Sequence, residues 1–539
     1  MARDARDANA RDANRRENHR RENREFAHRE FATIFVARGC DARARRGRRG
    51  RTRASARIVA RACVGVAIVG RARDALAGDP IGGSGANVDG YFVSWNSLKN
   101  AVNACSLIDA TLKTCVDGTV DIANWNVGDV TDMRNMFQDA TSFNGDISNW
   151  NVEAVTDMRN MFQGASSFNG DLSLWNTKSV TDMYYMFQGA SSFNGDISNW
   201  NVERVTDMYY MFQDATSFNG NISNWNVEAV TKMLNMFQGA SSFNGDMPNW
   251  NPESVTDMRY MFEGASSFNG DISNWNTKSV TDMRWMFQGA TSFNGDISKW
   301  NVERVTDMYY MFKDATSFNG DISAWNIQAV TMMSNMFEGA SSFNGDVSAW
   351  NIQAVTDMSN MFKGATSFNG DISNWNVERV KNMRYMFEGA SSFNGDISAW
   401  NIQAVTDMSY MFNNAWAFAR DITGWNAAAI AASRDSSKVF SMFNNATAWR
   451  AIYTNTQTSY WFENDGPPHL WTAGAAAPGA AAAAPGASVA DFPEWGVALV
   501  ALSLTLSTIM SIVVVVIARA LCAPKIFANR VVETRREGL

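Results

Sequence analysis

Apolar side chains recur along this chain with a period of 25 residues. Trp stands at positions 125, 150 and 175 and at every further 25 residues up to 425, each time followed by Asn. A Met-Phe pair recurs at 136/137, 161/162 and on to 411/412, and then slips by six residues to 442/443. Twelve regular units result, with a degenerate unit at about 426–449. A period of this length indicates a stacked repeat architecture rather than several ordinary domains.

Each unit predicts one short helix, as in the segment VTDMRNMFQGA of the second unit. Met158, Met161 and Phe162 stand at i, i+3 and i+4, which places them on one face of about two helical turns. Thr156 is placed to cap this helix, and the Asp that follows it suits the first turn. Gly164 supplies the stop.

The other half of the unit, SFNGDISNW at residues 142–150, predicts one brief strand. A unit of this size cannot bury its Phe, Ile, Trp and Met alone, so it must stack on copies of itself. With parallel strands about 4.8 Å apart, twelve units make a rod or arc roughly 55 Å long. The predicted fold class is α/β, a solenoid with one short parallel strand and one short helix in each repeat.

Polar side chains also repeat in register. Asn144 and its equivalents are predicted to bond the backbone of the next coil at a turn. Asp146 and Asp157 each begin a file of carboxylates about 5 Å apart, which either accept backbone hydrogen bonds or recruit a cation such as Ca²⁺. Asn221 and Met332 interrupt these files without disturbing the period, which favours turn bonds over calcium.

The recurring pattern DISNWNVEAVTDMRNMFQGASSFNGDIS resembles the repeat of BspA-like leucine-rich-repeat surface proteins, abundant as lipoproteins in mycoplasmas and as surface proteins in other microbes and protists. The match covers about residues 119–425, with W-N where the family commonly has W-D and FNG where FNQ is more usual. The resemblance implies a leucine-rich-repeat-like solenoid on a cell surface, often credited with adhesion to host or matrix proteins. It implies no catalytic residue.

Residues 497–518 carry the most specific localisation signal. These 22 residues contain no charge, and at about 1.5 Å per residue they span roughly 33 Å, enough for a bilayer core. Basic residues follow the segment, whereas Asp491 and Glu494 precede it, so the C-terminus is predicted to be cytoplasmic.

Near the N-terminus, a 9-residue apolar segment at 62–70 and an A-x-A site at 75–77 form a secretory pattern, with an organellar transit peptide as the alternative. We expect a single-pass type I protein of the plasma membrane with extracellular repeats.

Charge is unevenly distributed. Residues 1–73 carry 21 Arg and 8 acidic residues, a balance of 21 − 8 = +13, which leaves −7 − 13 = −20 for the rest. The acidic body argues against nucleic acid as a partner.

Taken together, these patterns divide the chain into seven predicted segments. They are a basic leader (1–77), an N-terminal cap (78–118), the repeat solenoid (119–425), a degenerate C-terminal cap (426–463), an Ala/Pro/Gly stalk (464–496), a transmembrane helix (497–518) and a cytoplasmic tail (519–539).

Two cysteines and two asparagines bear on secretion. Cys105 and Cys115 are predicted to form one extracellular disulfide, with two buried free thiols as the alternative. Asn221 and Asn445 begin N-x-S/T sequons and are candidate glycosylation sites.

The two positions before each Met-Phe pair vary most between units. If the Met and Phe side chains face inward, this pair faces outward, and Tyr, Trp and Arg are enriched at binding hot spots. The alternative is that these aromatic rings merely stack on their neighbours. The candidate ligand-binding residues are Tyr184, Tyr185, Tyr209, Tyr210, Tyr260, Trp285, Tyr309, Tyr310 and Tyr385.

Catalytic chemistry finds little support in the sequence. The three His residues all lie outside the repeats, which excludes His-dependent nucleophilic catalysis and His-bearing zinc sites within the solenoid. No phosphate-binding or dinucleotide motif is present. We predict a non-enzymatic surface protein, without cofactor or metal, that binds or adheres to protein or glycan ligands; the alternative is a self-associating wall or scale component.

Overall fold

The computed structural model describes residues 91–108, 121–427, 429–430, 436–455, 468 and 471–473. Its regular elements lie at the two ends of this part of the chain. Before the repeats come α3 (Trp95–Ile108) and the 3-10 helix η1 (Ile122–Asn124), and after them η2 (Ser436–Val439), α5 (Thr447–Ile452), β1 (Tyr453–Asn455) and β2 (Trp471–Ala473). β1 and β2 pair antiparallel.

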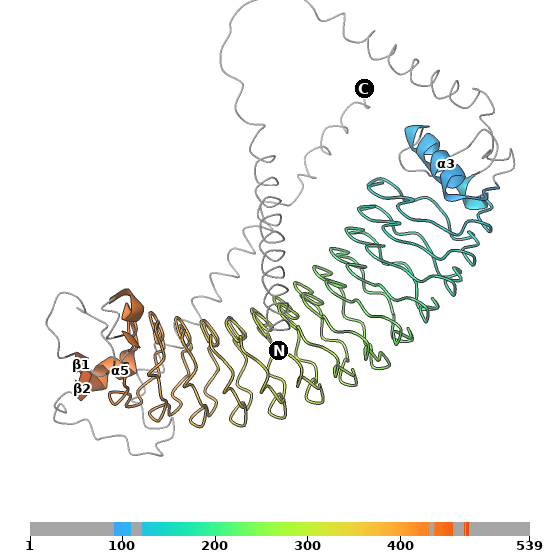
Figure 1. Cartoon of the computed structure of the whole chain (residues 1–539). Coiled ribbons are helices and arrows are strands. Elements are labelled where there is room, and N and C mark those ends of the chain that lie inside the picture. The colour runs from blue at the N-terminus through green and yellow to red at the C-terminus, as the bar shows by residue number, and fades with distance from the viewer. Residues whose placement is uncertain are drawn as a thin grey trace, which may run out of the picture. The chain divides into compact units, whose positions relative to one another are not determined.

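Between these ends the chain winds into successive coils, one for each sequence repeat (Figure 1). Isolated parallel bridges join equivalent residues of neighbouring coils, as between Asp157 and Asp182. After the bridge, alternate backbone N–H groups donate to the next coil: those of Met158, Asn160 and Phe162 reach the carbonyls of residues 182, 184 and 186 at 3.1, 2.9 and 2.9 Å. Neighbouring coils are thus held together by backbone hydrogen bonds, as in a parallel ladder.

The helix predicted in each repeat is absent from residues 125–427, and that prediction is wrong. The Met161 N–H donates to the Met158 carbonyl, three residues earlier (3.2 Å), and not to a carbonyl four residues earlier. Asn160 and Gly164 have φ of 55° and 69°, in the left-handed region, which a right-handed helix cannot contain. Two tight turns replace the helix, and they still place Met158, Met161 and Phe162 inside, with no exposed surface.

The strand predicted at residues 142–150 is also misplaced. That segment contains turns, whereas the bridges fall at Asp157 and its equivalents, within the segment predicted to be helical. Thr156, predicted to be a helix cap, instead donates its hydroxyl to the Thr131 carbonyl of the preceding coil (3.1 Å). The parallel ladder therefore runs through the other half of the repeat.

Aromatic rings fill the interior in continuous stacks. Trp200 and Trp225 are parallel within 1° at 6.4 Å, and the Trp225 indole N–H donates to the Ile197 carbonyl (3.1 Å). This bond recurs at every Trp from 150 to 425. Each coil adds two stacked Phe rings, such as Phe212 and Phe218 at 4.0 Å. Because the buried indole donors are satisfied, these large side chains stabilise the stack without an orphaned polar group.

The predicted asparagine ladder is confirmed. The Asn169 N–H donates to the Asn144 side-chain oxygen (2.9 Å), and the same bond recurs in each coil up to that from the Ala419 N–H to Asn394 (3.0 Å). Each Asn side chain therefore replaces a missing backbone acceptor where the coil turns.

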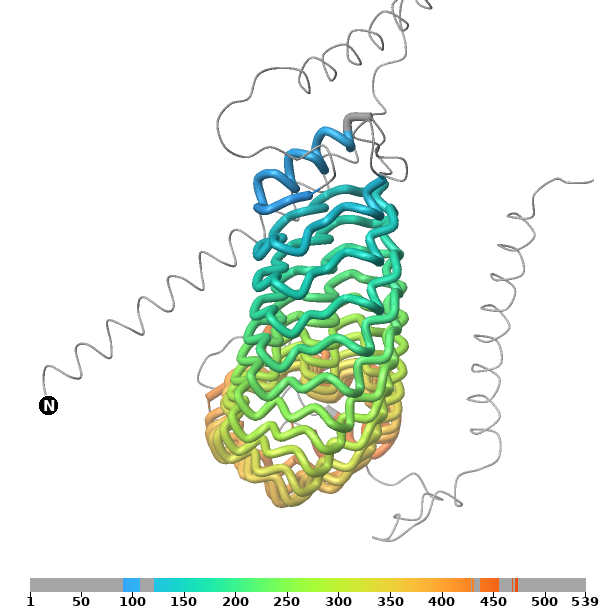
Figure 2. Tube along the Cα trace, turned by 90° about the vertical axis from the view of Figure 1, so that its right-hand side faces the viewer, coloured from blue at the N-terminus to red at the C-terminus, as the bar shows by residue number. Residues whose placement is uncertain are grey.

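Each coil is wedge-shaped. Between the third and fourth coils, ring centroids are 4.6 Å apart for Tyr185 and Tyr210 beside the bridges, 5.6 Å apart for the Phe pair 187/212 and 6.4 Å apart for the Trp pair 200/225. The stack is therefore tighter on the bridge side and bends towards it, and successive coils lie over one another in slightly turned orientations (Figure 2). The surface beside the bridges is on the inner side of the bend.

Helix α3 closes the first coil. The carbonyls of Arg134 and Met136 occupy positions that in later coils accept N–H groups from the preceding coil. Trp95 Nε1 donates to the Arg134 carbonyl, and Lys99 Nζ donates to the Met136 carbonyl, both at 2.7 Å. α3 lies within the predicted N-terminal cap (78–118), and its side chains satisfy acceptors that no coil precedes.

The six-residue slip lies between the twelfth coil and the degenerate unit. The N–H groups of Met408 and Tyr410 donate to the carbonyls of Lys438 and Phe440 at 2.8 and 2.9 Å, so the degenerate unit continues the ladder. α5 follows, and its buried Trp449 stacks on Phe443 at 4.6 Å.

Several predictions concern segments outside the described residues: the leader, the stalk, the membrane span at 497–518 and Cys115. No helix within the described part of the chain is both long and apolar enough to cross a bilayer. Cys105 is buried in α3 and is disulfide-bonded, which excludes the free-thiol alternative for this residue.

Candidate binding face

The variable pair of each repeat lies beside the parallel bridges. Because Met158, Met161 and Phe162 are buried, residues 159 and 160 between them point outward. We call the surface formed by Asp157, residues 159 and 160 and their equivalents in all coils the bridge face.

The second position of the pair requires a left-handed backbone. Its φ is 55° at Asn160, 56° at Tyr185 and 59° at Trp285. Asn tolerates this conformation, whereas for bulky residues it is an outlier that costs about 1–2 kcal/mol. The same chain uses Asn here in five coils and an aromatic residue in seven. The aromatic residues are thus held in a conformation for which the repeat has a less strained alternative.

These aromatic side chains gather in clusters. In the first, Tyr184 stacks on Tyr209 at 5.4 Å and Tyr185 on Tyr210 at 4.6 Å, and the two rings of each coil meet edge to face. The rings are half-buried. They stack along the file, as the alternative interpretation predicted, and keep part of their surface in solvent.

A second cluster follows after the coil that carries Leu234 and Asn235. Tyr260 stacks on Trp285 at 4.6 Å, and Trp285 meets Tyr309 edge to face at 5.2 Å. Burial raises the pKa of Tyr260 to about 12 and also raises that of Tyr309. Both phenols therefore stay neutral and act as hydrogen-bonding groups at physiological pH.

Four arginines of the bridge face pair with its carboxylates. Arg159 Nη2 contacts Asp157 Oδ2 at 2.6 Å, and its Nε lies 3.5 Å from Asp182 of the next coil. Arg134, Arg259 and Arg284 repeat this arrangement. The predicted calcium alternative gains no support from this file, and no group of three potential metal ligands occurs among the described residues.

The outer file of carboxylates makes turn bonds, as predicted. The Ser173 N–H donates to Asp171 Oδ1 at 2.9 Å, and together with the serine hydroxyl it lowers the pKa of Asp171.

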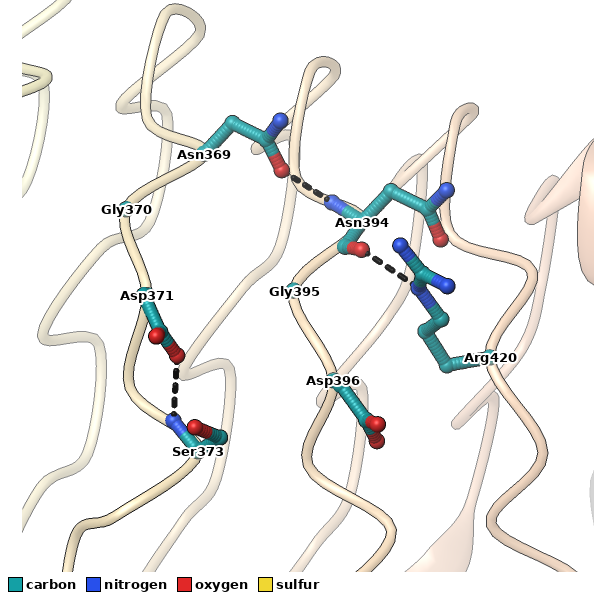
Figure 3. A pocket seen from close by; sticks show the side chains of 8 residues that line it. All are labelled: Asn369, Gly370, Asp371, Ser373, Asn394, Gly395, Asp396 and Arg420. Carbon is teal, nitrogen blue, oxygen red and sulfur yellow. Dashed lines mark hydrogen bonds between the residues drawn. The ribbon is translucent and has the colours of Figure 1, made fainter. Parts of the chain in front are cut away.

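A shallow polar depression lies beside Asp396, where this file ends (Figure 3). Arg420 replaces the glycine of FNG there, and its Nε donates to the Asn394 carbonyl (2.8 Å). Its lining is almost wholly the repeated turn, and no aromatic ring lines it.

A third cluster at the C-terminal end of the bridge face includes two residues that the sequence analysis missed. Tyr385 stacks on Tyr410 at 4.7 Å, and Tyr410 meets Phe440 edge to face at 5.4 Å. Tyr410 occupies the same repeat position as Tyr385, so the spacing alone could have found it. Phe440 was hidden by the six-residue slip. The two sequon residues, Asn221 and Asn445, are exposed.

The profile of one protein family, described as "Mycoplasma protein of unknown function, DUF285", matches the chain over residues 106–221, 196–284, 269–355 and 340–456. These overlapping matches cover every regular coil and α5. No curated protein matches the chain.

Proposed function

The chain belongs to the DUF285 family of mycoplasma-type repeat proteins, and from this premise we propose that it is a surface protein that binds protein or glycan ligands through the bridge face. The proposal includes the finer assignment to BspA-like leucine-rich-repeat solenoids. It also includes a non-catalytic role and a type I topology, with the repeats held outside the cell by residues 497–518.

One observation carries the binding proposal: aromatic residues occupy a left-handed position where the same chain uses Asn elsewhere. Tyr185 and Tyr210 accept a backbone strain that Asn160 avoids. Such strain commonly marks functional sites. The inner side of a bent repeat stack is also the surface that repeat proteins use for extended ligands.

The test replaces the aromatic pairs of two coils with the Ser-Asn pair found in another coil of the same chain. Ser359 and Asn360 occupy the variable pair of the tenth coil, so the fourfold variant Tyr184→Ser, Tyr185→Asn, Tyr209→Ser and Tyr210→Asn keeps a sequence that this backbone accepts. The full-length chain, purified in detergent, is screened against panels of matrix proteins and glycans. We expect the variant to lose captured ligands at least tenfold, with its coils intact by circular dichroism.

A matched control changes exposed residues of the fourth and fifth coils. Glu203→Gln and Glu228→Gln alter exposed side chains away from the bridge face, and we expect them to leave capture unchanged. Equal capture by the fourfold variant and the wild type would contradict the proposal.

The second candidate function is a self-associating wall or scale component. It is favoured by the outer surface, where Asn and Asp side chains repeat almost without change from coil to coil. Concentration-dependent assembly of the purified chain, without capture of any ligand, would support this function instead.

A further inference from the structure

The eleventh coil departs from the charge pattern of the bridge face. Asn382 stands where most coils carry Asp, and Lys381 where most carry Thr. In four other coils the arginine of the variable pair is gripped by the Asp two residues earlier. Arg384 has no such partner, because Asn382 Oδ1 accepts only from the Arg384 backbone N–H (3.1 Å). No carboxylate among the described residues lies within ion-pair distance of its guanidinium.

The guanidinium of Arg384 is instead held against an aromatic ring. Its Nη2 donates to the Tyr385 hydroxyl at 3.0 Å, and its central carbon lies 4.7 Å from the Tyr385 ring centroid. A guanidinium fixed in this way keeps most of its donors available. Planar donors of this kind match carboxylate and sulfate oxygens better than an ammonium does.

A depression of about 320 Å³ lies beside Arg384, where the slipped last unit meets the twelfth coil. Lys438 and Asp407 line it and pair at 3.2 Å. Two cations and one carboxylate leave a local charge of 2 − 1 = +1 in the depression, on a body that is strongly acidic overall.

An exposed ring completes the depression. Phe440 is 56% exposed and meets Tyr410 edge to face. Phe440 occupies the first position of the variable pair, where the preceding coil carries Ser409, so no ring of the preceding coil stacks face to face on it. A large apolar ring left this exposed in a polar depression commonly marks a contact surface.

We propose that this depression binds an acidic sugar residue, with a carboxylate or sulfate group on Arg384 and Lys438 and the apolar face of the sugar ring on Phe440. The inference rests on the proposed function and names a ligand class for it. An acidic peptide side chain would use the two cations but would leave the exposed Phe440 ring unoccupied, so the combination of charge and ring favours the saccharide. The volume suits one monosaccharide unit of a longer chain.

The first test restores the pattern of the other coils. Asn382→Asp supplies the carboxylate that pairs with arginine in four other coils, so this position of the repeat tolerates Asp. The new carboxylate should neutralise the guanidinium of Arg384. Its control is Asn221→Asp, which adds the same charge at the outer turn, where most coils also carry Asp. Binding of the full-length chain to sulfated and uronate oligosaccharides is measured by titration at physiological salt, with neutral dextran and hexaglutamate as further probes. The basic leader is common to all variants, so only differences between them are interpreted.

We expect Asn382→Asp to weaken binding of the acidic oligosaccharides about tenfold and Asn221→Asp to leave it unchanged, with neutral dextran unbound. Phe440→Ser should weaken oligosaccharide binding without affecting any residual binding of hexaglutamate. The proposal is overturned if the wild type binds no acidic oligosaccharide, if both Asp variants weaken binding equally, or if hexaglutamate binds as tightly as the oligosaccharides. If Asn382→Asp has no effect while the fourfold tyrosine variant still loses its ligand, this inference fails and the proposed function stands.

Discussion

The contact between coils at Gly270 gives a sharp test of the stacking geometry. A Cβ atom at Gly270 would lie 2.1 Å from the Gly245 carbonyl oxygen and 2.8 Å from its carbon. At this coil Pro248 has no N–H to donate to Asp246, whose Oδ1 instead accepts from the Asp271 N–H of the next coil (2.9 Å). The backbone atoms that a methyl group would meet are therefore held in place by hydrogen bonds between the two coils.

The same substitution at Gly295 provides the control. There the added Cβ would meet the edge of the Phe293 ring at 3.0 Å and the preceding carbonyl oxygen only at 3.6 Å. A ring edge can shift by a few tenths of an ångström, whereas the Gly245 carbonyl is followed directly by Asp246 and Met247, which both bond to Asp271 of the next coil. Overpacking costs about 1–3 kcal/mol, and replacing Gly by Ala stabilises through the unfolded chain by about 0.4–1 kcal/mol. We expect Gly270→Ala to destabilise by about 2 kcal/mol and Gly295→Ala to be nearly neutral.

Hydrogen exchange is the suitable assay, because a stack of coils opens locally rather than in one transition. Peptides that contain Met247 and Asp271 should exchange their amide hydrogens faster in Gly270→Ala, whereas peptides from the tenth and eleventh coils should not change. Comparable protection of the fifth and sixth coils in both variants would refute the inferred close contact.

Two further predictions concern the cap and the pH range. Lys99→Met removes the donor to the Asn135 and Met136 carbonyls, so it should destabilise the first coil by about 1–3 kcal/mol. Faster amide hydrogen exchange at residues 133–139, with exchange of the twelfth coil unchanged, would verify this. Equally faster exchange in all coils would contradict it. The raised pKa of Tyr260, about 12 against the ordinary value of 10.0, favours the neutral ring in the folded state. Its contribution to stability should be complete below pH 10 and be lost as the pH rises to about 12, which a melting series with phenolate absorbance can follow; a melting temperature that stays constant over this range would argue against burial of the ring.

Sequence reasoning succeeded where a residue type has one structural use. The Asn144 file was predicted because a repeated Asn beside Gly is suited to bond a turn, and the inward Met158, Met161 and Phe162 were predicted because their spacing requires one face. The helix prediction failed for the same spacing, since two successive three-residue turns place i, i+3 and i+4 together as well as a helix does. The left-handed φ of Tyr185 could not be foreseen, because Tyr is not a residue that favours it.

The candidate site was predicted in part. The candidate aromatic residues keep part of their surface in solvent, and stacking and partial exposure coexist in Tyr184 and Tyr185. The same two positions are buried where they hold Leu234 and Asn235 or Ser334 and Asn335. The pairing of Arg159 with Asp157 could not be predicted from the sequence. In the predicted helix, side chains two residues apart would not face each other. The depression beside Arg384 depends on Phe440 joining the ladder through the bond from the Tyr410 N–H to its carbonyl, a position that the six-residue slip hides in the sequence.

Attachment of each coil only to the coil before and the coil after has a mechanical consequence. A load applied to the two ends of the stack would detach coils one at a time, because no hydrogen bond among the described coils spans more than one boundary. Each detached coil would release 25 residues, up to about 85 Å of extended chain in place of the roughly 5 Å it occupied in the stack. A molecule built this way would yield to tension in steps of nearly equal length, and would dissipate work at every step while both of its ends stay attached.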